Sequence, residues 1–215
     1  MAGIAELLDR GSCKMGFSLT PRQLETFCAF HKELVRWGSK INLTALLNDD
    51  QRLVEELFLD SLAPLKIIER RGTNTDSILD IGSGGGFPGI PIKIYEPSHQ
   101  ITLTDAIEKK VFFLRHAIRS LSLSSTTALN LKFTNKGAPG LPIDHFDWAV
   151  SKAVSDSSVL GFWAHPHLKK GGGLICMKGP GENPQHMEGY EFIDELTYEL
   201  PFNKFKRFLF LFQKV

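Results

Sequence analysis

The sequence contains little cysteine, and its cysteines are not spaced as pairs. Only three occur in 215 residues, at positions 13, 28 and 176, and no Cys-x-x-Cys motif is present. This scarcity argues against a structural zinc site and a disulfide framework, and it is typical of a protein with reduced thiols in the cytosol. We therefore expect a cytoplasmic protein without a metal site.

The sequence also lacks a long apolar segment and an excess of charge of either sign. No apolar run approaches the roughly 20 residues that span a membrane. Charged side chains interrupt the first ten residues, unlike a signal peptide. The formal net charge is +1, so a nucleic acid would have to be bound by a local basic patch. We expect a monomer that does not associate with membranes, with one α/β domain and a small appendage.

Residues 1–72 are expected to form a helical extension. Thr20, Pro21 and Gln23 form a helix start, because Thr20 can cap, proline suits the first helical position and Gln23 can complete a capping box. Apolar residues then recur at helical spacing as far as Gly38. A second helix is expected to begin near residues 49–50 and to continue to about residue 65.

From about residue 73 onward, apolar segments of strand length alternate with segments of helix length. Such alternation indicates a parallel sheet with helices on both faces. We expect an α/β, Rossmann-like core over residues 73–215, with a doubly wound, mostly parallel sheet of seven strands. The expected strands are 77–81, 100–104, 129–133, 146–151, 174–177, 195–200 and 207–213, and the expected helices are 89–95, 107–121 and 156–168.

A glycine-rich loop follows the first expected strand, with the sequence Asp-Ile-Gly-Ser-Gly-Gly-Gly-Phe-Pro-Gly over residues 80–89. In an open parallel sheet, ligands bind beyond the carboxyl ends of the strands, where this loop lies. Glycines let the backbone turn tightly and approach a ligand closely. Gly84, Gly86 and Gly89 also satisfy the G-x-G-x-x-G pattern of dinucleotide-binding proteins, so the glycines alone leave the ligand open.

Two carboxylates favour a methyl donor over a dinucleotide. The charge of Asp80 would oppose a pyrophosphate, but it suits S-adenosylmethionine, which carries a sulfonium and an ammonium group. The segment from Asp80 to Gly86 has the acid-x-Gly-x-Gly-x-Gly form of methyltransferases, and Asp105 ends the second expected strand, where it suits ribose hydroxyls. Each carboxylate has a structural alternative, since Asp80 could brace the loop and Asp105 could cap the next helix. We expect S-adenosylmethionine as the cofactor, bound at Asp80, Gly82, Gly84, Gly86 and Asp105.

Several motifs together resemble one family, the bacterial ribosomal RNA methyltransferases RsmG (GidB). The resemblance covers roughly residues 34–180. Its most specific part is the loop at residues 82–91, which ends in an unusual Phe-Pro-Gly-Ile-Pro sequence. The supporting motifs, in order, are Trp-Gly-Ser-Lys-Ile-Asn-Leu-Thr at 37–44, Leu-Asp-Ser-Leu at 59–62, Lys-Lys then Phe-Leu within 109–114, Phe-Asp then Ser-Lys-Ala within 146–153, and Leu-Ile-Cys-Met-Lys-Gly at 174–179.

The resemblance implies a class I methyltransferase fold and methyl transfer to N7 of a guanosine in small-subunit (16S) ribosomal RNA. It implies ribosomal RNA or the small ribosomal subunit as the partner. It also implies cofactor contacts at Gly82, Phe87, Gly137, Ala138 and Lys152. The chain departs from the family pattern at four places: Gly38 replaces an asparagine, Leu57 a histidine, Lys136 to Ala138 an R-x-E motif, and Lys152 an arginine.

Guanine N7 carries a lone pair and no proton, so no general base is needed to expose it. The sequence agrees, because it contains no Asn-Pro-Pro-Tyr or Asp-Pro-Pro-Tyr motif after the fourth expected strand. We therefore expect no catalytic residue and a reaction driven by alignment. Lys152 is expected to face the target pocket, where it could contact the guanine or a phosphate, or instead brace a carboxylate such as Asp80.

RNA contacts are expected from basic side chains near the carboxyl edge of the sheet, because phosphate contacts supply much of the affinity for RNA. A solvated helix face or strand end gives the same pattern without binding RNA. Lys178 is the strongest candidate, since it ends the fifth expected strand beside the pocket. The candidates are Lys109, Lys110, Arg115 and Lys178.

The segment after the fourth expected strand holds ring side chains that are expected to be structural. Phe162 and Trp163 are interpreted as core residues rather than platforms for base stacking. His165 and His167 lie near the expected helix end and are interpreted as capping or surface residues.

Two other functions are compatible with these residues. A methyltransferase for a small molecule or a protein would use the N-terminal helices as an acceptor-specific lid. A non-catalytic nucleotide-binding module is compatible with the departures at Ala138 and Lys152. Binding of S-adenosylmethionine, but not of NAD, would favour a methyltransferase over a dinucleotide-binding protein.

Overall fold

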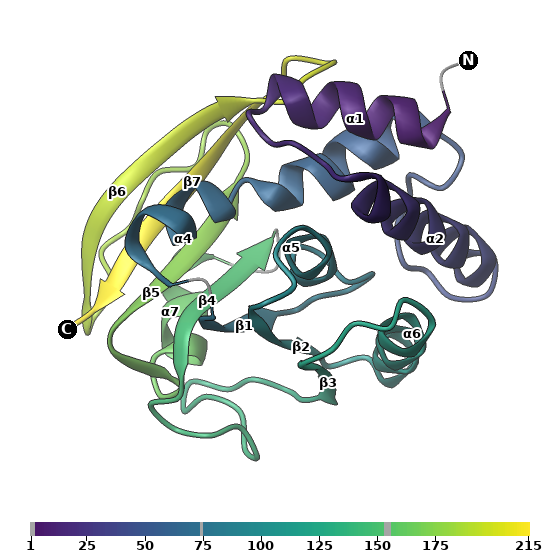
Figure 1. Cartoon of the computed structure of the whole chain (residues 1–215). Coiled ribbons are helices and arrows are strands. Elements are labelled where there is room, and N and C mark those ends of the chain that lie inside the picture. The colour runs from purple at the N-terminus through teal and green to yellow at the C-terminus, as the bar shows by residue number, and fades with distance from the viewer. Residues whose placement is uncertain (1–2, 74, 153–155) are drawn as a thin grey trace.

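The computed structural model describes residues 3–73, 75–152 and 156–215, and it contains a seven-stranded sheet with helices on both faces (Figure 1). The strands are β1 (Ser77–Ile81), β2 (Gln100–Asp105), β3 (Thr126–Asn130), β4 (Phe146–Lys152), β5 (Leu168–Lys178), β6 (Tyr190–Glu199) and β7 (Lys206–Lys214). Their order is β3-β2-β1-β4-β5-β7-β6. The first five strands pair in parallel, and β7 runs antiparallel to both β5 and β6. The predicted doubly wound, mostly parallel sheet is confirmed.

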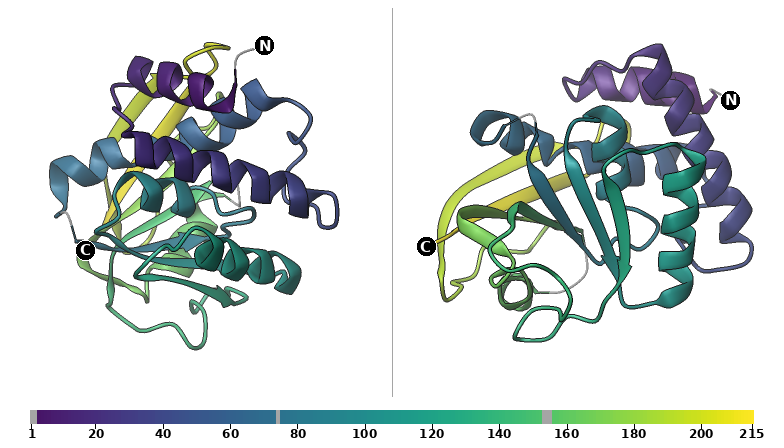
Figure 2. Two further views of the ribbon diagram at one scale, coloured as in Figure 1. Left: turned by 45° about the vertical axis from the view of Figure 1, so that its right-hand side comes forward. Right: turned by 60° about the horizontal axis from the view of Figure 1, so that its bottom comes forward.

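Two apolar clusters fill the two faces of the sheet, because neighbouring strand residues point to opposite sides. One cluster contains Ile78 and Val150 and joins them to the N-terminal helices and to α5 (Gly89–Tyr95) and α6 (Glu108–Ser120). The other contains Leu79 and Ala149 and joins them to α7 (Ser157–Ala164) and to the segment after β3. The expected helical extension and the expected core thus bury one apolar cluster in common, and Figure 2 shows the N-terminal helices beside the helices of the core.

The N-terminal region begins with α1 (Ile4–Lys14) and α2 (Pro21–Gly38), and α2 packs across α5 and α6. The predicted capping box is confirmed at the start of α2, where Thr20 and Gln23 exchange hydrogen bonds. The buried face of α2 carries Phe27, Phe30 and Leu34. This helix therefore lies over α5, the helix that follows the glycine loop.

The second expected N-terminal helix is broken into different kinds of turn. The Asp49 side chain accepts from the Arg52 N–H at 3.0 Å, which begins α3 (Asp50–Leu53). The chain then passes through a π-helical turn, η1 (Val54–Leu59), and a 3-10 turn, η2 (Asp60–Leu62), before α4 (Leu65–Arg71) begins. Turns of the π type are rare and often lie at functional sites. Here η1 and η2 bring Glu56 and Asp60 to the end of β4.

Four expected boundaries are wrong. β5 begins at Leu168 and not at residue 174, because Phe146 of β4 already pairs with Leu168. β6 begins at Tyr190 and not at residue 195, because it pairs with β7 as far as Lys214. β3 lies three residues earlier than expected, at Thr126–Asn130, because it pairs with β2 over those positions and residues 131–133 leave the sheet. The helix expected to reach residue 168 ends at Ala164. Pro166 has no N–H to continue it, and β5 already begins at Leu168.

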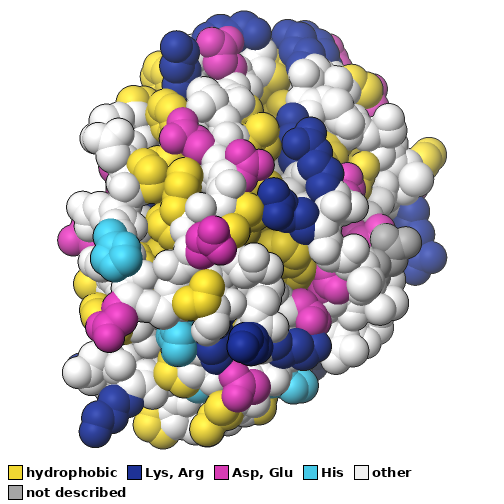
Figure 3. Space-filling view, turned by 90° about the vertical axis from the view of Figure 1, so that its left-hand side faces the viewer, with side chains coloured by type: hydrophobic (Ala, Val, Ile, Leu, Met, Phe, Trp, Pro, Cys, Tyr) yellow, Lys and Arg dark blue, Asp and Glu magenta, His cyan; other side chains and the backbone are white. Residues whose placement is uncertain are grey.

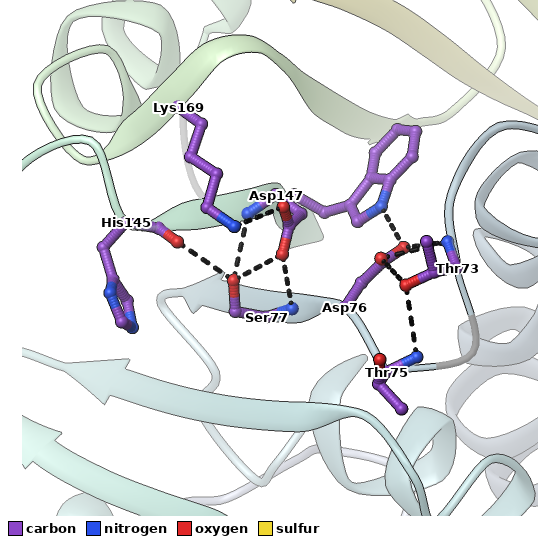
Figure 4. Close-up of polar contacts among 8 residues, drawn as sticks. Thr73, Thr75, Asp76, Ser77, His145, Asp147 and Lys169 are labelled. Atoms are coloured by element: carbon purple, nitrogen blue, oxygen red, sulfur yellow. Dashed lines mark hydrogen bonds and ion pairs between the residues drawn. The ribbon is translucent and has the colours of Figure 1, made fainter.

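A polar network ties together the amino ends of β1 and β4 (Figure 4). Asp147 accepts from the N–H and the hydroxyl of Ser77 at 2.9 and 2.7 Å, and from Lys169 Nζ at 2.6 Å. Asp76 accepts from Trp148 Nε1 at 2.8 Å. The network lies at the opposite edge of the sheet from the glycine loop, so we interpret it as fixing the strand register.

Candidate functional site

A cavity of about 520 Å³ opens at the carboxyl ends of β1, β2 and β4. β1 lies between β2 and β4 in the sheet, and this switch point is where open α/β sheets bind their ligands. We term it the loop cavity. It is lined by Ile81, Gly82, Asp105, Ala106, Ile107, Lys110, Leu131, Lys132, Phe133, Lys152 and Trp163.

Three glycines of the loop have positive φ angles that other residues rarely adopt. These angles are 75° at Gly82, 55° at Gly84 and 97° at Gly86. The Gly84 N–H donates to Asp105 Oδ2 at 3.0 Å, and the Ile107 N–H donates to Oδ1 at 2.8 Å. Asp105 therefore holds the loop against the cavity wall. A carboxylate has about four lone-pair positions, so acceptor capacity is left for the predicted ribose contact.

The Asp80 side chain lies behind the loop rather than among the residues that line the cavity. It is fully buried, and its Oδ2 accepts from the Gly89 N–H at 2.8 Å. Its Oδ1 has no hydrogen-bond partner among the described residues. Burial is the main cause that raises the pKa of Asp80 to about 7. Asp80 therefore braces the glycine loop, which was the structural alternative to cofactor binding. A direct contact between Asp80 and the cofactor stays a prediction.

We predict that Asp80→Asn flattens the pH dependence of stability between about pH 4 and about pH 7. The unfolded chain releases the Asp80 proton near its ordinary pKa of 3.8, whereas the folded protein keeps it up to a pKa of about 7. The folded state thus binds the extra proton in this window, so its stability falls as pH rises across it. The free energy of unfolding, measured with denaturant, should fall less between about pH 5 and about pH 8 in the variant than in the wild type. Equal losses would contradict a protonated, buried Asp80.

Phe87 points away from the loop cavity and into the N-terminal helices. Its ring centroid lies 5.6 Å from that of Phe30 and 5.9 Å from that of Phe58. Gly86 is crowded on the same side, since a Cβ there would lie 2.5 Å from Ile90 Cδ1. The predicted cofactor contact at Phe87 would therefore have to come from its backbone.

The far wall of the loop cavity is apolar and comes from the segment after β3 and from α7. Leu131, Phe133 and Trp163 form it, and the rings of Phe133 and Trp163 stack with centroids 5.7 Å apart. Flat apolar walls of this kind suit a planar heterocycle. Phe162 and Trp163 were expected in the core, but Phe162 is 48% exposed, and Trp163 is half-buried and lines the cavity.

Gly137 and Ala138 lie in a turn beside this wall and are not among the residues that line the cavity. The Ala138 N–H donates to His167 Nε2 at 2.9 Å, and His167 Nδ1 lies 2.9 Å from the Pro142 carbonyl oxygen. Both contacts are satisfied when the imidazole is neutral with its proton on Nδ1. His167 is buried, so its interpretation as a surface or capping residue is wrong. It anchors the turn that carries two predicted cofactor contacts.

A second cavity, of about 440 Å³, adjoins the first through Lys152, which lines both. We term it the Asp60 cavity. Its walls come from η1, η2, the ends of β4 and β5, and the β6–β7 pair. It is lined by Leu46, Glu56, Leu57, Asp60, Lys152, Met177, Lys178, Gly179, Glu182, Tyr198 and Arg207.

Lys152, which is half-buried, forms an ion pair with the buried Asp60 between the two cavities. Lys152 Nζ lies 2.7 Å from Asp60 Oδ2 and also donates to the Glu56 carbonyl oxygen. The Tyr198 hydroxyl donates to Asp60 Oδ1 at 2.6 Å. Burial, and then the Asp60 charge, raise the pKa of Tyr198 well above its ordinary value of 10, so the hydroxyl stays a donor. Lys152 thus braces a carboxylate, as the alternative predicted, but the carboxylate is Asp60 and not Asp80.

A family model described as "rRNA small subunit methyltransferase G" matches residues 23–199. The chain belongs to this family. A Ribosomal RNA small subunit methyltransferase G from Geotalea uraniireducens (strain Rf4) is 36% identical, over 98% of this chain and 96% of its own length. One from Geobacter sp. (strain M21) is 41% identical, over 81% of this chain and 77% of its own length.

The fold is similar to that of solved methyltransferase structures. A SAM-dependent methyltransferase from Aquifex aeolicus matches with a TM-score of 0.55 at 19% identity, covering 79% of this chain and 95% of its own. The predicted Rossmann-like methyltransferase fold is confirmed. No helix in the described ranges is long and apolar enough to cross a bilayer. Over the same ranges, no group of three or more His, Cys, Asp or Glu side chains could hold a metal ion.

Two departures from the methyltransferase G pattern lie on different walls of the site. At Ala138, where the family pattern has a glutamate, the backbone N–H is held by His167. At Lys152, where it has an arginine, the ammonium keeps one ion pair with Asp60. A lysine supplies a point charge in place of the planar fork of donors of an arginine. The site therefore keeps a cation at the boundary between the cavities.

The basic residues predicted to contact RNA have different surroundings in this member of the family. Lys109 and Arg115 are exposed on α6, and Arg115 Nε donates to the Ala128 carbonyl oxygen. Lys110 lines the loop cavity. The Lys178 side chain, the strongest candidate, is only 6% exposed and pairs with Glu182 at 2.8 Å. Lys178 is therefore not an open phosphate contact, and RNA binding by these side chains stays a prediction.

Proposed function

We propose that this protein is an S-adenosylmethionine-dependent methyltransferase that modifies N7 of a guanosine in small-subunit (16S) ribosomal RNA. The match to the family model over residues 23–199 supports this activity. So do relatives that are 36% and 41% identical and share the name Ribosomal RNA small subunit methyltransferase G. The observation that carries the proposal is the pair of cavities that meet at Lys152, because methyl transfer needs a donor site and an acceptor site side by side.

The residues of the loop cavity fit S-adenosylmethionine. The volume of about 520 Å³ lies within the roughly 300–1,000 Å³ of small-molecule sites. The apolar wall suits an adenine ring, and Asp105 can accept from ribose hydroxyls. When bound, S-adenosylmethionine supplies a methyl group activated by the positive sulfonium. The residues proposed to hold it, directly or by shaping the loop and its turn, are Asp80, Gly82, Gly84, Gly86, Phe87, Asp105, Gly137, Ala138 and Lys152.

The Asp60 cavity is the proposed site of the acceptor base. Guanine O6 is a hydrogen-bond acceptor and N7 beside it carries a free lone pair. An ammonium at the boundary of the two cavities can therefore hold O6 while N7 faces the loop cavity. The Lys152 ammonium is fixed there by Asp60 at 2.7 Å. The chain needs no general base for this acceptor, so its contribution is alignment and the exclusion of water.

The proposed partner is the small ribosomal subunit or its RNA, met by a monomer in the cytoplasm. A base inside a helix has to leave the stack to enter a cavity of this depth, so an exposed loop is the favoured target. The proposed RNA contacts are Lys109, Lys110 and Arg115 on α6, where Lys110 lines the loop cavity, and Lys178, which lines the Asp60 cavity.

We predict that 16S ribosomal RNA from a strain without this protein lacks one N7-methylguanosine. Borohydride reduction followed by aniline cleavage should remove one cut that the wild-type RNA shows, and the intact gene should restore it. A gene carrying Gly86→Val serves as the control, because that variant should not hold the donor loop. An unchanged cleavage pattern, with S-adenosylmethionine still bound by the purified protein, would move the acceptor to a small molecule or a protein.

A further inference from the structure

We propose that a hollow at the β6–β7 turn binds the phosphate backbone of the RNA substrate. The hollow has a volume of about 610 Å³, and Lys14, Lys66, Lys204 and Lys206 line it. We term it the lysine hollow. The end of α1, the beginning of α4 and the β6–β7 pair contribute these side chains. The inference rests on the proposed function, because it names a second place at which the same RNA is held.

The charge of the lysine hollow is strongly one-sided. Four lysines and a single acidic residue, Glu199, line it, which leaves an excess of three positive charges. Within the described ranges, none of these four lysines forms an ion pair. Other lysines of the protein are paired, as Lys152 is with Asp60 and Lys169 with Asp147. Unpaired cations that converge on one concavity favour an anionic ligand.

Lys66 gives a second reason to expect an anion. It is half-buried, and its Nζ lies 5.5 Å from the ring centroid of Phe17. Burial, and then the positive charge of Arg70, lower the pKa of Lys66. Among the described residues Lys66 has no ion-pair partner, and the charged neighbour that shifts its pKa is the cation Arg70. A phosphate group in the hollow would supply the missing opposite charge.

The lysine hollow adjoins the proposed acceptor site. Tyr198 lines both the hollow and the Asp60 cavity. Along β7, Lys206 lines the hollow and the next residue, Arg207, lines the Asp60 cavity. An RNA strand whose base enters the Asp60 cavity can thus lay its backbone along the β6–β7 pair toward the hollow. Lysine and arginine side chains gather at the top of the view in Figure 3, the end at which α1 and the β6–β7 turn lie in Figure 1.

The position beside the acceptor site and the charge together favour RNA over an acidic protein as the occupant. The chain as a whole has a net charge of only +1, so the one-sided charge of the hollow is local. A repeating polyanion can occupy both the hollow and the neighbouring acceptor cavity. RNA is the polyanion that the proposed reaction already places in the Asp60 cavity, which Tyr198 lines together with the hollow.

The test is the salt dependence of RNA binding by a Lys204→Glu/Lys206→Glu variant. Both lysines are exposed, so the fold should tolerate the change. Each lost phosphate contact lowers the slope of log affinity against log salt by about 0.7–0.9. We expect the slope for 16S ribosomal RNA to fall by about 1.4–1.8 and the affinity at about 0.1 M salt to weaken at least about tenfold. Binding of S-adenosylmethionine should not change.

The matched control is Arg119→Glu/Lys170→Glu, which changes the net charge equally at exposed positions outside the hollow. A Lys204→Gln/Lys206→Gln variant checks the result without reversing charge, and its melting temperature checks the fold. The hollow is the wrong site if the two charge-reversal variants lose affinity equally, or if neither does. If the Lys204→Glu/Lys206→Glu variant lost affinity for the assembled subunit but not for free RNA, the occupant of the hollow would be a ribosomal protein and not a phosphate backbone. If the wild type neither binds nor methylates the RNA, the proposed function fails as well.

Discussion

The Lys152→Met variant should lose about 3–5 kcal/mol of folding stability and should no longer methylate ribosomal RNA. Asp60 is 2% exposed, and its charged partner is the Lys152 ammonium at 2.7 Å. Without that ammonium, the buried carboxylate keeps, among the residues that the structure describes, only the hydrogen bond from the Tyr198 hydroxyl at 2.6 Å. Removing one partner of a buried pair is costly because the other charge is left uncompensated. Denaturant unfolding measures the first effect, and methyl incorporation into 16S ribosomal RNA measures the second.

Two further variants separate the two roles of Lys152, which are the ion pair with Asp60 and the proposed contact with the acceptor base. Lys152→Met with Asp60→Asn removes both charges, so it should recover most of the stability while staying inactive. Lys152→Arg should keep both properties, because it places the residue of the family pattern at the same boundary. An active double variant would show that Lys152 only braces Asp60. A Lys152→Met protein of wild-type stability would contradict the ion pair itself.

The donor side of the site could be predicted from sequence because its parts are local. The glycine loop lies between a short apolar strand and a helix, and Asp105 ends the next strand. Strand pairing brings Asp105 beside the loop, where it accepts from the Gly84 N–H. Only chain direction and the rule that parallel strands end at one edge were needed to place these groups together. The role of Asp80 differed from the expected cofactor contact. A side chain at the end of a buried strand can point behind the loop as easily as into the cavity.

The acceptor side could not be predicted in the same way, because its contacts join distant segments. Tyr198 bonds to Asp60 across 138 residues, and Lys152 bonds to the Glu56 carbonyl oxygen across 96. Periodicity reports which face of an element is apolar, but it does not report which elements meet. The π-helical turn at Val54–Leu59 also interrupts an apolar pattern that predicts one regular helix. The Leu-Asp-Ser-Leu motif at 59–62 was the only sequence signal that included Asp60.

Gly86→Val should destabilise the protein by about 3–5 kcal/mol and abolish the binding of S-adenosylmethionine. Gly86 has a φ of 97°, where a β-branched residue is strained. A Cβ there would also lie 2.5 Å from Ile90 Cδ1 and 3.3 Å from Phe30 Cζ, so the loop would have to move away from the first turn of α5 and from α2. That movement would also carry the Gly84 N–H away from Asp105. Thermal unfolding and isothermal titration with S-adenosylmethionine measure the two losses.

Gly84→Val is the matched control, because it puts the same side chain two residues earlier on the same loop. Its φ of 55° lies in the left-handed region, which costs an L residue about 1–2 kcal/mol. The nearest atom to a Cβ there is the Gly82 carbonyl oxygen at 4.0 Å. This variant should therefore fold with a smaller loss of stability, yet its side chain should block the close approach of the backbone to the donor. If Gly84→Val bound S-adenosylmethionine as tightly as the wild type, the donor would not lie against this loop, and the loss in Gly86→Val would report unfolding alone.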